Sequence, residues 1–324
     1  MQEVAAAWFA RRTTTVADWP IDRLVAAKGA CRVSVVLPAL DEEPTVGEIV
    51  AGVRALADRT GLVDEIVVVD SGSVDRTAEI AAAAGGSVHH RDDILPELGS
   101  YPGKGEVLWK ALAVTSGDIL VYVDADLTDF RQSFVTGLLG PLLCDETVLM
   151  VKGFYDRPLL DVTAAGGGRV TELAARPLLA AFFPELSGVV QPLAGEYAAR
   201  RPLLEELPFA AGYGVETGLL IDAYRGHGLD AIAQVDLGHR THGHQDTAAL
   251  GRMAATILQT VLRRAEVEEP LATTLTQFRR RSDGSIEPVD SEVSWPDRPP
   301  MSVVRGRRSG PKSPTPSESG GRRA

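Results

Sequence analysis

The sequence predicts an α/β protein in which helices flank a mostly parallel, Rossmann-like β-sheet. The prediction rests on three successive units, each of which combines an unbroken apolar run with a stretch of helical spacing. Apolar runs without alternation are typical of strands buried on both faces of a sheet. Alternation of such strands with helices implies right-handed crossovers between parallel strands.

The first unit occupies residues 32–56. Its strand is "RVSVVLPAL", a β-branched apolar run limited by Pro38. The stretch that follows, "DEEPTVGEIVAGVRAL", opens with acidic residues and Pro44 and continues with helical spacing. Acidic residues and proline are typical of a first helical turn, so we expect the helix to begin among them.

The second and third units complete the first half of the chain. Residues 64–85, "DEIVVVDSGSVDRTAEIAAAAG", indicate a strand, a polar turn and a helix closed by Gly85. Residues 103–126, "GKGEVLWKALAVTSGDILVYVDAD", indicate a helix followed by a third strand. We therefore expect residues 1–150 to form a nucleotide-binding α/β half, and residues 151–304 to form a smaller, less regular part.

Composition and charge exclude several classes of protein. The net charge of −11 disfavours a nucleic-acid partner, because phosphate backbones must be met by concentrated Lys and Arg. No stretch approaches 18 apolar residues, and "MQEVAAAWFARRTTT" lacks the order of a secretory signal, so we expect no membrane span and a cytoplasmic location. The two distant cysteines argue against a disulfide framework or a zinc cluster.

The end of the chain differs from the rest in composition. Residues 305–324 combine six basic residues with Pro, Ser and Gly, and this composition cannot bury enough apolar surface to fold. We expect a disordered basic tail, with a polyanion-binding arm as the alternative.

Each of the three predicted strands ends in acidic residues: Asp41 and Glu42, then Asp70, then Asp124 and Asp126. In doubly wound sheets, ligands bind beyond the carboxyl ends of the strands. Paired carboxylates suit Mg²⁺ or Mn²⁺, which proteins bind through one or two carboxylates plus the phosphates of a substrate. We expect a metal and sugar-nucleotide site at "DAD", with a turn of solvated acids as the alternative.

Two loops and one lysine support a nucleotide site. The Pro-stiffened loop in "VVLPALDEE" can receive a nucleobase, and "DSGS" offers a carboxylate and hydroxyls to a base or ribose. With "DAD", these loops look like the GT-A class of nucleotide-sugar glycosyltransferases. The glycine signatures of Rossmann dehydrogenases and P-loop proteins are missing. In "YPGKGEVLWKAL", Lys104 stands at a helix start, where it can meet a phosphate; a solvated lysine is the alternative.

The second half contains three further polar clusters. In "TAAGGGRVTELAARPLLA", glycines, Arg169 and Thr171 precede an apolar helix, a suitable place for a phosphate or carboxylate. Glu196 and Glu216 each lie beside glycines, and one of the two can be structural. "VDLGHRTHGHQD" gathers three histidines that offer a metal ligand or form a polar loop: His239, His242 and His244.

These motifs, in this order, resemble the actinobacterial glucosyl-3-phosphoglycerate synthases. The resemblance covers about residues 17–300 and is carried by "SVVLPALDEE", "VVDSGSVDRT", "PGKGEVLWKALAVTSGDILVYVDADL", "GGGRVTELAARPLLA", "QPLAGEYAARR", "PFAAGYGVETGLLIDAY" and "GLDAIAQVDLGHRTH". It implies a retaining GT-A enzyme that moves glucose from UDP-glucose to the 2-hydroxyl of 3-phosphoglycerate. It also implies a divalent metal, Mg²⁺ or Mn²⁺, and a homodimer.

The resemblance also implies roles for individual residues. The donor contacts would be Pro38, Ala39, Leu40, Glu42, Ser71, Lys104, Asp124 and Ala125. The acceptor contacts would be Gly168, Arg169 and Thr171, and the metal ligands Asp126 and His242. The catalytic set would be Asp124, Asp126, Arg169 and Glu216. Two departures from the family pattern are small: Ala125 replaces a common Ser and Asp41 a common Asn.

Two questions of mechanism and substrate stay open at this stage. Retention favours front-face attack, in which the departing phosphate oxygen accepts the proton of the acceptor; double displacement through Glu216 is the alternative. For the function, the alternatives are a mannosyl-3-phosphoglycerate synthase using GDP-mannose, a nucleotidyltransferase, and a non-catalytic nucleotide-sugar sensor.

Overall fold

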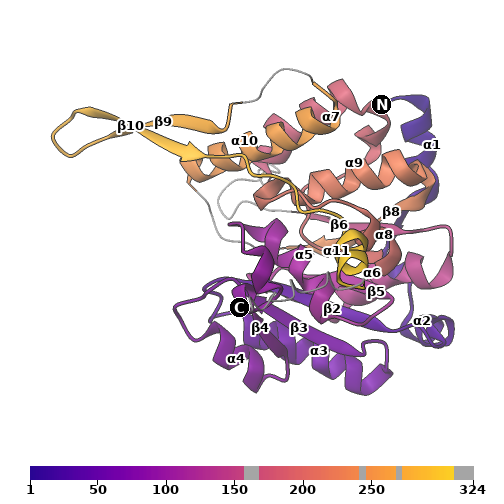
Figure 1. Ribbon diagram of the computed structural model, residues 1–324. Coiled ribbons are helices and arrows are strands. Elements are labelled where there is room, and N and C mark those ends of the chain that lie inside the picture. Colours follow the sequence, from indigo (N-terminus) through magenta and orange to yellow (C-terminus); the bar gives the residue numbers. More distant parts are fainter. Residues whose placement is uncertain (157–167, 241–245, 268–271, 310–324) are drawn as a thin grey trace, which may run out of the picture.

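The computed structural model describes residues 1–156, 168–240, 246–267 and 272–309. Its centre is an eight-stranded sheet with the order β1-β8-β6-β7-β5-β2-β3-β4, flanked by helices (Figure 1). All pairs in this sheet are parallel except those of β7, which runs against both of its neighbours. The predicted α/β class with a mostly parallel sheet is therefore confirmed.

The strands of the main sheet are short, like most strands in α/β proteins. Their bounds are β1 Thr13–Thr15, β2 Val33–Ala39, β3 Glu65–Asp70, β4 Ser87–His90, β5 Ile119–Tyr122, β6 Met150–Asp156, β7 Tyr197–Arg200 and β8 Ile232–His239. A separate antiparallel hairpin consists of β9 Thr274–Arg280 and β10 Ile286–Glu292.

The α-helices of the described chain connect and cover these strands. Their bounds are α1 Glu3–Arg12, α2 Ile21–Lys28, α3 Val46–Thr60, α4 Thr77–Ala83, α5 Lys104–Val114, α6 Gln132–Cys144, α7 Arg176–Phe182, α8 Arg201–Glu206, α9 Val215–His227, α10 Thr247–Arg264 and α11 Met301–Ser309. A π-helical turn, η4, spans Thr171–Ala175 and runs into α7. Among these residues, none of the helices has the length and apolar character needed to cross a membrane.

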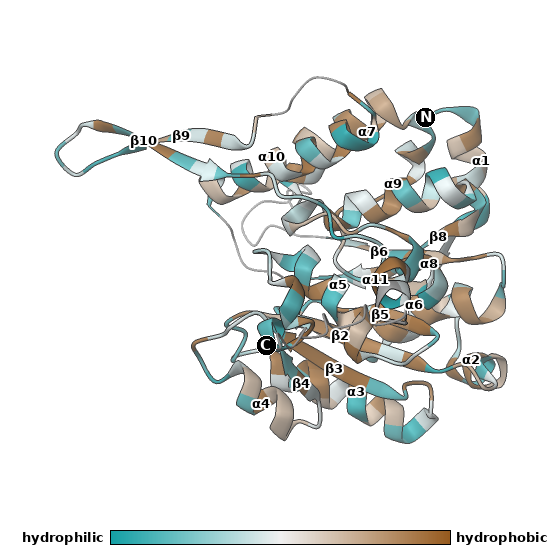
Figure 2. Ribbon diagram, viewed as in Figure 1, coloured by the Kyte–Doolittle hydropathy of each residue, from teal (hydrophilic) through white to brown (hydrophobic). Residues whose placement is uncertain are grey.

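The side chains of the central strands alternate between two apolar cores. In β2, Val36 faces the core that contains α5, α8 and α9, whereas Val35 and Leu37 face the core that contains α3 and α6. Figure 2 shows β2 and β3 as mainly hydrophobic strands. Because both faces of these strands are covered, their sequence reads as an unbroken apolar run, which is why the sequence predicted them.

The helix predicted after the first apolar run begins later than the sequence indicated. Helix α3 starts at Val46, so Asp41 and Pro44 lie in the loop before it. Asp41 has φ = 57°, a left-handed conformation that Asp and Asn tolerate better than most residues. Its carboxylate accepts a hydrogen bond from Val74 N–H at 2.8 Å, and its N–H donates to Ser73 Oγ at 2.9 Å. These bonds hold the acidic segment in a loop rather than a helical turn.

The two halves expected from the sequence share one sheet. Strands β6, β7 and β8 come from the second half and pair directly with β5 and with one another. At the chain end, residues 305–309, expected in the tail, belong to α11, because this helix buries Met301 and Val304 in the core beside α5. Residues 310–324 lie outside the described residues.

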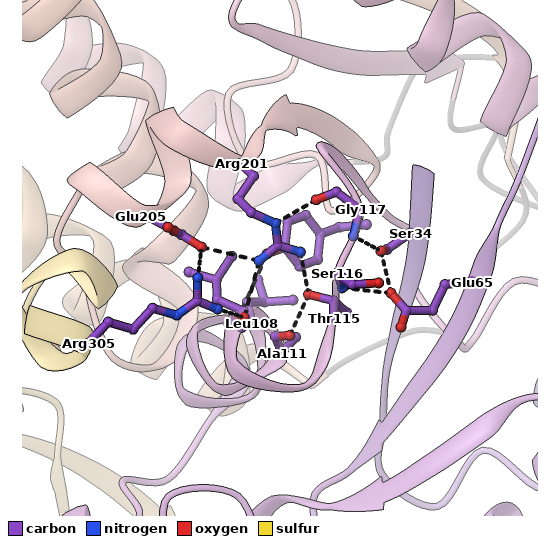
Figure 3. A network of polar contacts seen from close by, with 12 residues as sticks. Ser34, Glu65, Leu108, Ala111, Thr115, Ser116, Gly117, Arg201, Glu205 and Arg305 are labelled. Atoms are coloured by element: carbon purple, nitrogen blue, oxygen red, sulfur yellow. Dashed lines mark hydrogen bonds and ion pairs between the residues drawn. The ribbon is translucent and has the colours of Figure 1, made fainter. Parts of the chain in front are cut away.

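Helix α5 is held at its C-terminal end by two arginines (Figure 3). Arg201 donates to the Leu112 carbonyl at 3.2 Å and, as Figure 3 shows, to the Gly117 carbonyl at 2.5 Å. Arg305 of α11 donates to the same Leu112 carbonyl at 2.8 Å, and Glu205 accepts bonds from both guanidinium groups. The last carbonyls of a helix have no partner within it, so these cations fix the far end of the helix that begins at Lys104.

Candidate active site

The strand order brings distant segments to one edge of the sheet. Strands β2, β3, β5, β6 and β8 all end at this edge, whereas the antiparallel β7 begins there. In the β5–β7 pair, Tyr122 lies opposite Tyr197, so Asp124, which follows β5, comes close to Glu196, which precedes β7. The carboxyl edge predicted to hold the site therefore receives residues from both halves of the chain.

Lys104 joins two of the predicted site residues. Its ammonium, at the first position of α5, pairs with Asp124 and lies 2.9 Å from Glu216 Oε1 in the first turn of α9. Gly195 leaves the space for this pair, because a Cβ there would lie 2.5 Å from both Asp124 Oδ1 and Lys104 Nζ. The structure thus brings together Lys104, Asp124 and Glu216 from three separate segments.

Arg240 connects the same cluster to the second acid of "DAD". Its Nη2 lies 2.7 Å from Asp126 Oδ1 and 3.2 Å from Asp124 Oδ2. Its Nη1 contacts Tyr155 Oη at 2.6 Å and Glu196 at 3.2 Å. Arg240 and Glu196 are buried, whereas the Asp126 side chain is 45% exposed, so Asp126 is the acid of the pair that is more open to a ligand.

The charges in this cluster shift one another's pKa values. Burial alone would lower the pKa of the Lys104 amine, but the carboxylates of Asp124 and Glu216 raise it above its ordinary value. Burial would likewise raise the pKa of Asp124, yet Lys104 and Arg240 lower it. Both groups are therefore charged at neutral pH. Burial, followed by the charges of Asp126 and Asp124, raises the pKa of the Glu42 carboxyl to about 7.

Burial is the largest cause of the raised pKa of Glu42, and the charges of Asp126 and Asp124 raise it further, so additional negative charge is unfavourable at this place. A divalent cation with oxygen ligands fits such a place, since Mg²⁺ and Mn²⁺ are bound through few carboxylates plus substrate phosphates. In the part of the chain that the structure describes, no group of three or more His, Cys, Asp or Glu side chains could hold a metal ion. His242, the predicted third contributor, lies within residues 241–245, outside the described residues.

The predicted donor loops lie at the same edge. Ala39 pairs with Asp70 across β2 and β3, and Ser71 N–H donates to the Ala39 carbonyl at 2.9 Å. Thr45 Oγ1 donates to the carbonyl of Ala125 at 2.6 Å, which ties the first loop to "DAD". Pro38 is half-buried and Ala39 is buried, whereas Leu40 is 53% exposed.

The hydroxyls and carboxylate of "DSGS" are partly used within their own turn. Asp70 Oδ1 accepts from Ser73 N–H at 3.0 Å and from Ser73 Oγ. The sequence predicted that this carboxylate would contact a base or ribose, whereas in the structure it stabilises the loop. Ser71 remains the half-buried hydroxyl of the motif beside the predicted base pocket.

The predicted acceptor residues form a separate group at the start of η4. Gly168 has φ = 87°, and its carbonyl accepts from Glu172 N–H at 3.0 Å. Thr171 is buried and Arg169 is exposed. The turn packs on α10 and runs into α7, which lies far from β2 and β3 in Figure 1.

Sequence reasoning missed two charged residues of the cluster. Arg240 follows β8 directly, in the segment where only the histidines were singled out; of these, His239 is exposed and lies 3.6 Å from Asp156. Lys152 is buried in β6 and donates to the Ala194 carbonyl at 2.6 Å. Burial lowers the pKa of Lys152 to about 8, against the charge of Glu216. A lone cation inside "LMVKGFY" was the available signal, since charged residues are rarely buried without a partner.

Comparisons with known proteins agree with this geometry. The model of glycosyl transferase family 2 matches residues 34–159. The glucosyl-3-phosphoglycerate synthase of Mycolicibacterium smegmatis is 50% identical over 304 residues, covering 93% of this chain and 99% of that protein. The synthase of Petrotoga mobilis is 45% identical over 282 residues, covering 84% of this chain and 87% of that protein.

Solved structures show the same similarity. A crystal structure of glucosyl-3-phosphoglycerate synthase from Mycobacterium tuberculosis, in complex with Mn²⁺, uridine-diphosphate-glucose and phosphoglyceric acid, has a TM-score of 0.83 and 49% identity, covering 91% of this chain and 99% of that chain. A second structure of that protein, with Mg²⁺ and uridine-diphosphate, has the same TM-score and identity. The similarity thus spans both halves of the sheet and the acidic edge between them, and the chain belongs to the family of glucosyl-3-phosphoglycerate synthases.

Proposed function

We propose that this enzyme transfers glucose from UDP-glucose to the 2-hydroxyl of 3-phosphoglycerate with retention of the α configuration. The observation that carries the proposal is the Lys104–Asp124–Glu216 cluster at the carboxyl edge of the sheet. It offers an ammonium to the diphosphate of the donor and carboxylates to the metal and the sugar. The Mycobacterium tuberculosis relative binds uridine-diphosphate-glucose and phosphoglyceric acid together, which supports the same pair of substrates here.

The metal of the proposed reaction is Mg²⁺ or Mn²⁺, held by Asp126 and His242 with Asp124 beside them. When bound, it neutralises negative charge on the departing diphosphate. Lys104 adds to this neutralisation from the N-terminus of α5, where backbone N–H groups also favour an anion. Pro38, Ala39, Leu40, Glu42 and Ser71 are the proposed contacts to the uridine side.

The acceptor is proposed to bind beside η4. Arg169 would meet the phosphate or carboxylate of 3-phosphoglycerate, while Gly168 and Thr171 offer a backbone and a hydroxyl group. This assignment is supported by the exposure of Arg169 and by the left-handed backbone of Gly168, which lets the chain approach a ligand closely. Donor and acceptor would then be held by different halves of the chain.

Front-face attack is the mechanism that the geometry favours. The donor bond from C1 to the diphosphate oxygen breaks, the acceptor 2-hydroxyl oxygen bonds to C1 from the same face, and its proton goes to the departing oxygen. Glu216 is buried and paired with Lys104 at 2.9 Å, an arrangement suited to orienting that ammonium. Double displacement would use Glu216 as the nucleophile, and its carboxylate would first have to separate from Lys104.

The proposed function is tested by a turnover matrix of donors and acceptors. UDP-glucose and GDP-mannose are each combined with 3-phosphoglycerate, with and without Mg²⁺, and the released nucleotide is measured. We expect UDP release only with UDP-glucose, 3-phosphoglycerate and metal. Preference for GDP-mannose would identify a mannosyl-3-phosphoglycerate synthase, and binding without turnover a sensor. Pyrophosphate release in a separate reaction with UTP and glucose 1-phosphate would identify a nucleotidyltransferase.

A homodimer is part of the proposal, and the β9–β10 hairpin supports it. The hairpin extends from the body beside α10 (Figure 1), with Phe278 73% and Ile286 54% exposed. A two-stranded hairpin alone is marginally stable in water, so a second copy of the chain is a suitable cover for it. Light scattering should give the mass of two chains for the wild type and for Val4→Asp, and one chain for Phe278→Asp/Ile286→Asp. Because both proposed substrates are soluble metabolites, we also propose a cytoplasmic location.

A further inference from the structure

We propose that the segment of residues 293–300, here called the C-terminal strap, positions Lys104 against Glu216, and that Arg298 is the positioning residue in it. The inference rests on the proposed function, in which Lys104 meets the donor diphosphate. Neither residue of the Lys104–Glu216 pair touches Arg298 in the contacts described below, so Arg298 would act through the backbone segments that carry the pair.

The side chain of Arg298 holds the first turn of α5. Its Nε and Nη2 lie 2.6 Å and 2.8 Å from the two carboxylate oxygens of Glu106. Glu106 is fully buried and stands two residues after Lys104. A bidentate pair of this kind fixes direction as well as distance, because the guanidinium fork matches the carboxylate plane.

The same guanidinium also holds the residues before Lys104. Its Nη1 donates to the Leu98 carbonyl at 3.0 Å, and Nη2 donates to the Gly99 carbonyl at 3.1 Å. Its carbon lies 4.0 Å from the centre of the Tyr101 ring, a cation–π contact. Arg298 therefore contacts the chain on both sides of Lys104, and these contacts restrain the position of the start of α5.

The backbone of Arg298 holds the segment that carries Glu216. Arg298 and Phe209 exchange two hydrogen bonds, at 2.8 Å and 3.0 Å, as an antiparallel bridge. The segment after Phe209 packs without a gap on the start of α5, since a Cβ at Gly103 would lie 2.6 Å from the Cα of Gly212. One residue thus contacts both segments whose side chains form the Lys104–Glu216 pair.

The neighbouring residue anchors the strap on the opposite side. Asp297 pairs with Arg263 at 3.3 Å and Arg264 at 3.1 Å in α10, and Arg264 pairs with Asp222 of α9 at 2.8 Å. Trp109 Nε1–H donates to the carbonyl of Pro299 at 2.8 Å. Because Arg298 binds α5 and Asp297 binds α10, the strap links these two helices. The pair between Arg264 and Asp222 extends the link to α9.

The test uses Arg298→Lys, which keeps the charge but loses the planar fork. Arg305→Gln is the matched control, since Arg305 holds the far end of the same helix and lies outside the site. We expect Arg298→Lys to weaken UDP binding by calorimetry, and to lower kcat/KM for UDP-glucose by roughly 10- to 100-fold well below the Tm, because small misplacements are costly. The KM for 3-phosphoglycerate should stay unchanged, and Arg305→Gln should lower only the Tm.

A double-mutant cycle with Lys104→Met decides whether the effect passes through Lys104. If it does, Arg298→Lys should weaken UDP binding in the wild-type background and have no effect in Lys104→Met. Equal loss in both backgrounds, or UDP affinity within twofold of wild type, would overturn the inference. Should Arg298→Lys fail to fold, Glu106→Gln replaces it under the same criteria. The proposed function fails separately, if the wild type binds UDP but does not transfer glucose to 3-phosphoglycerate.

Discussion

Arg240 Nη2 lies 2.7 Å from Asp126 Oδ1, so the second acid of "DAD" is oriented by a buried guanidinium. Tyr155 and Glu196 contact Nη1 of the same guanidinium, and these contacts keep the Arg240 side chain in its buried position. The half-exposed carboxylate therefore has one oxygen fixed by Arg240, while the exposed part of the side chain is accessible to a ligand. This arrangement prepares Asp126 for a metal at little further cost in side-chain entropy.

The first prediction concerns this acid. Asp126→Ala should lower kcat by at least ~10³-fold, which corresponds to about 4 kcal/mol of lost transition-state stabilisation. The Tm should change little, because the side chain is half exposed. Steady-state kinetics with and without EDTA measure the effect, with Asp58→Ala, an exposed acid of α3, as the control. Full wild-type activity in EDTA contradicts the metal assignment.

The second prediction tests the space at Gly195. Gly195→Ala should displace Asp124 and Lys104, since its Cβ would lie 2.5 Å from an atom of each. We expect kcat/KM for UDP-glucose to fall at least ~100-fold, as misplacement of a positioned group by about 1 Å can cost that much. Gly226→Ala in α9, where a Cβ meets nothing within 4 Å, should keep activity and gain stability. Similar kinetics for both variants would contradict the prediction.

The third prediction concerns pH. The pKa of Glu42 rises from its ordinary 4.5 to about 7 in the folded, metal-free protein. Between these values the native state binds more protons than the unfolded state, so stability present below pH 4.5 is lost as the pH rises through 7. In EDTA, the Tm of Glu42→Gln should exceed that of the wild type increasingly above pH 5. Added Mg²⁺ should shrink the difference, and parallel Tm curves in EDTA would refute the shift.

The fourth prediction separates acceptor binding from structure at Arg169. Arg169→Lys keeps the charge but loses bidentate geometry, so losing a charge-assisted hydrogen bond should cost ~1.5–3 kcal/mol. The kcat/KM for 3-phosphoglycerate should fall roughly 10- to 150-fold, while the KM for UDP-glucose barely moves. If the variant instead loses thermal stability and keeps its acceptor KM, Arg169 supports η4 and does not bind the acceptor.

The fifth prediction concerns the chain end. Deleting residues 305–324 should lower the Tm, because Arg305 bonds to Leu112 and Glu205 and α11 would lose its last turns. Deleting residues 310–324, a stretch rich in Pro, Ser and Gly, should leave the Tm unchanged. Thermal melts of both truncations make the comparison. Equal Tm values would mean that α11 adds nothing measurable through its last turns.

Local sequence was sufficient for the acids at the ends of the parallel strands in the first half of the chain. Asp70 and Asp124 were placed correctly because parallel buried strands read as apolar runs and end at one edge. Arg240 and Lys152 could not be placed this way, since they reach the edge through β8 and β6, whose order around the antiparallel β7 is set by contacts distant in sequence. The acidic residues and proline that are typical of a helix start also placed the beginning of α3 too early. Asp41 adopts a left-handed conformation in spite of this composition.

The grip of Arg298 on Glu106 joins residues 192 positions apart. During synthesis, α5 and the strands beside it leave the ribosome long before the strap does, and domains begin to fold as they emerge. A nascent chain can therefore bury most of its apolar sheet while the start of α5 still lacks its side-chain clamp. Activity would then appear abruptly, when the last tenth of the chain has been translated, and fragments released early would be compact yet inert.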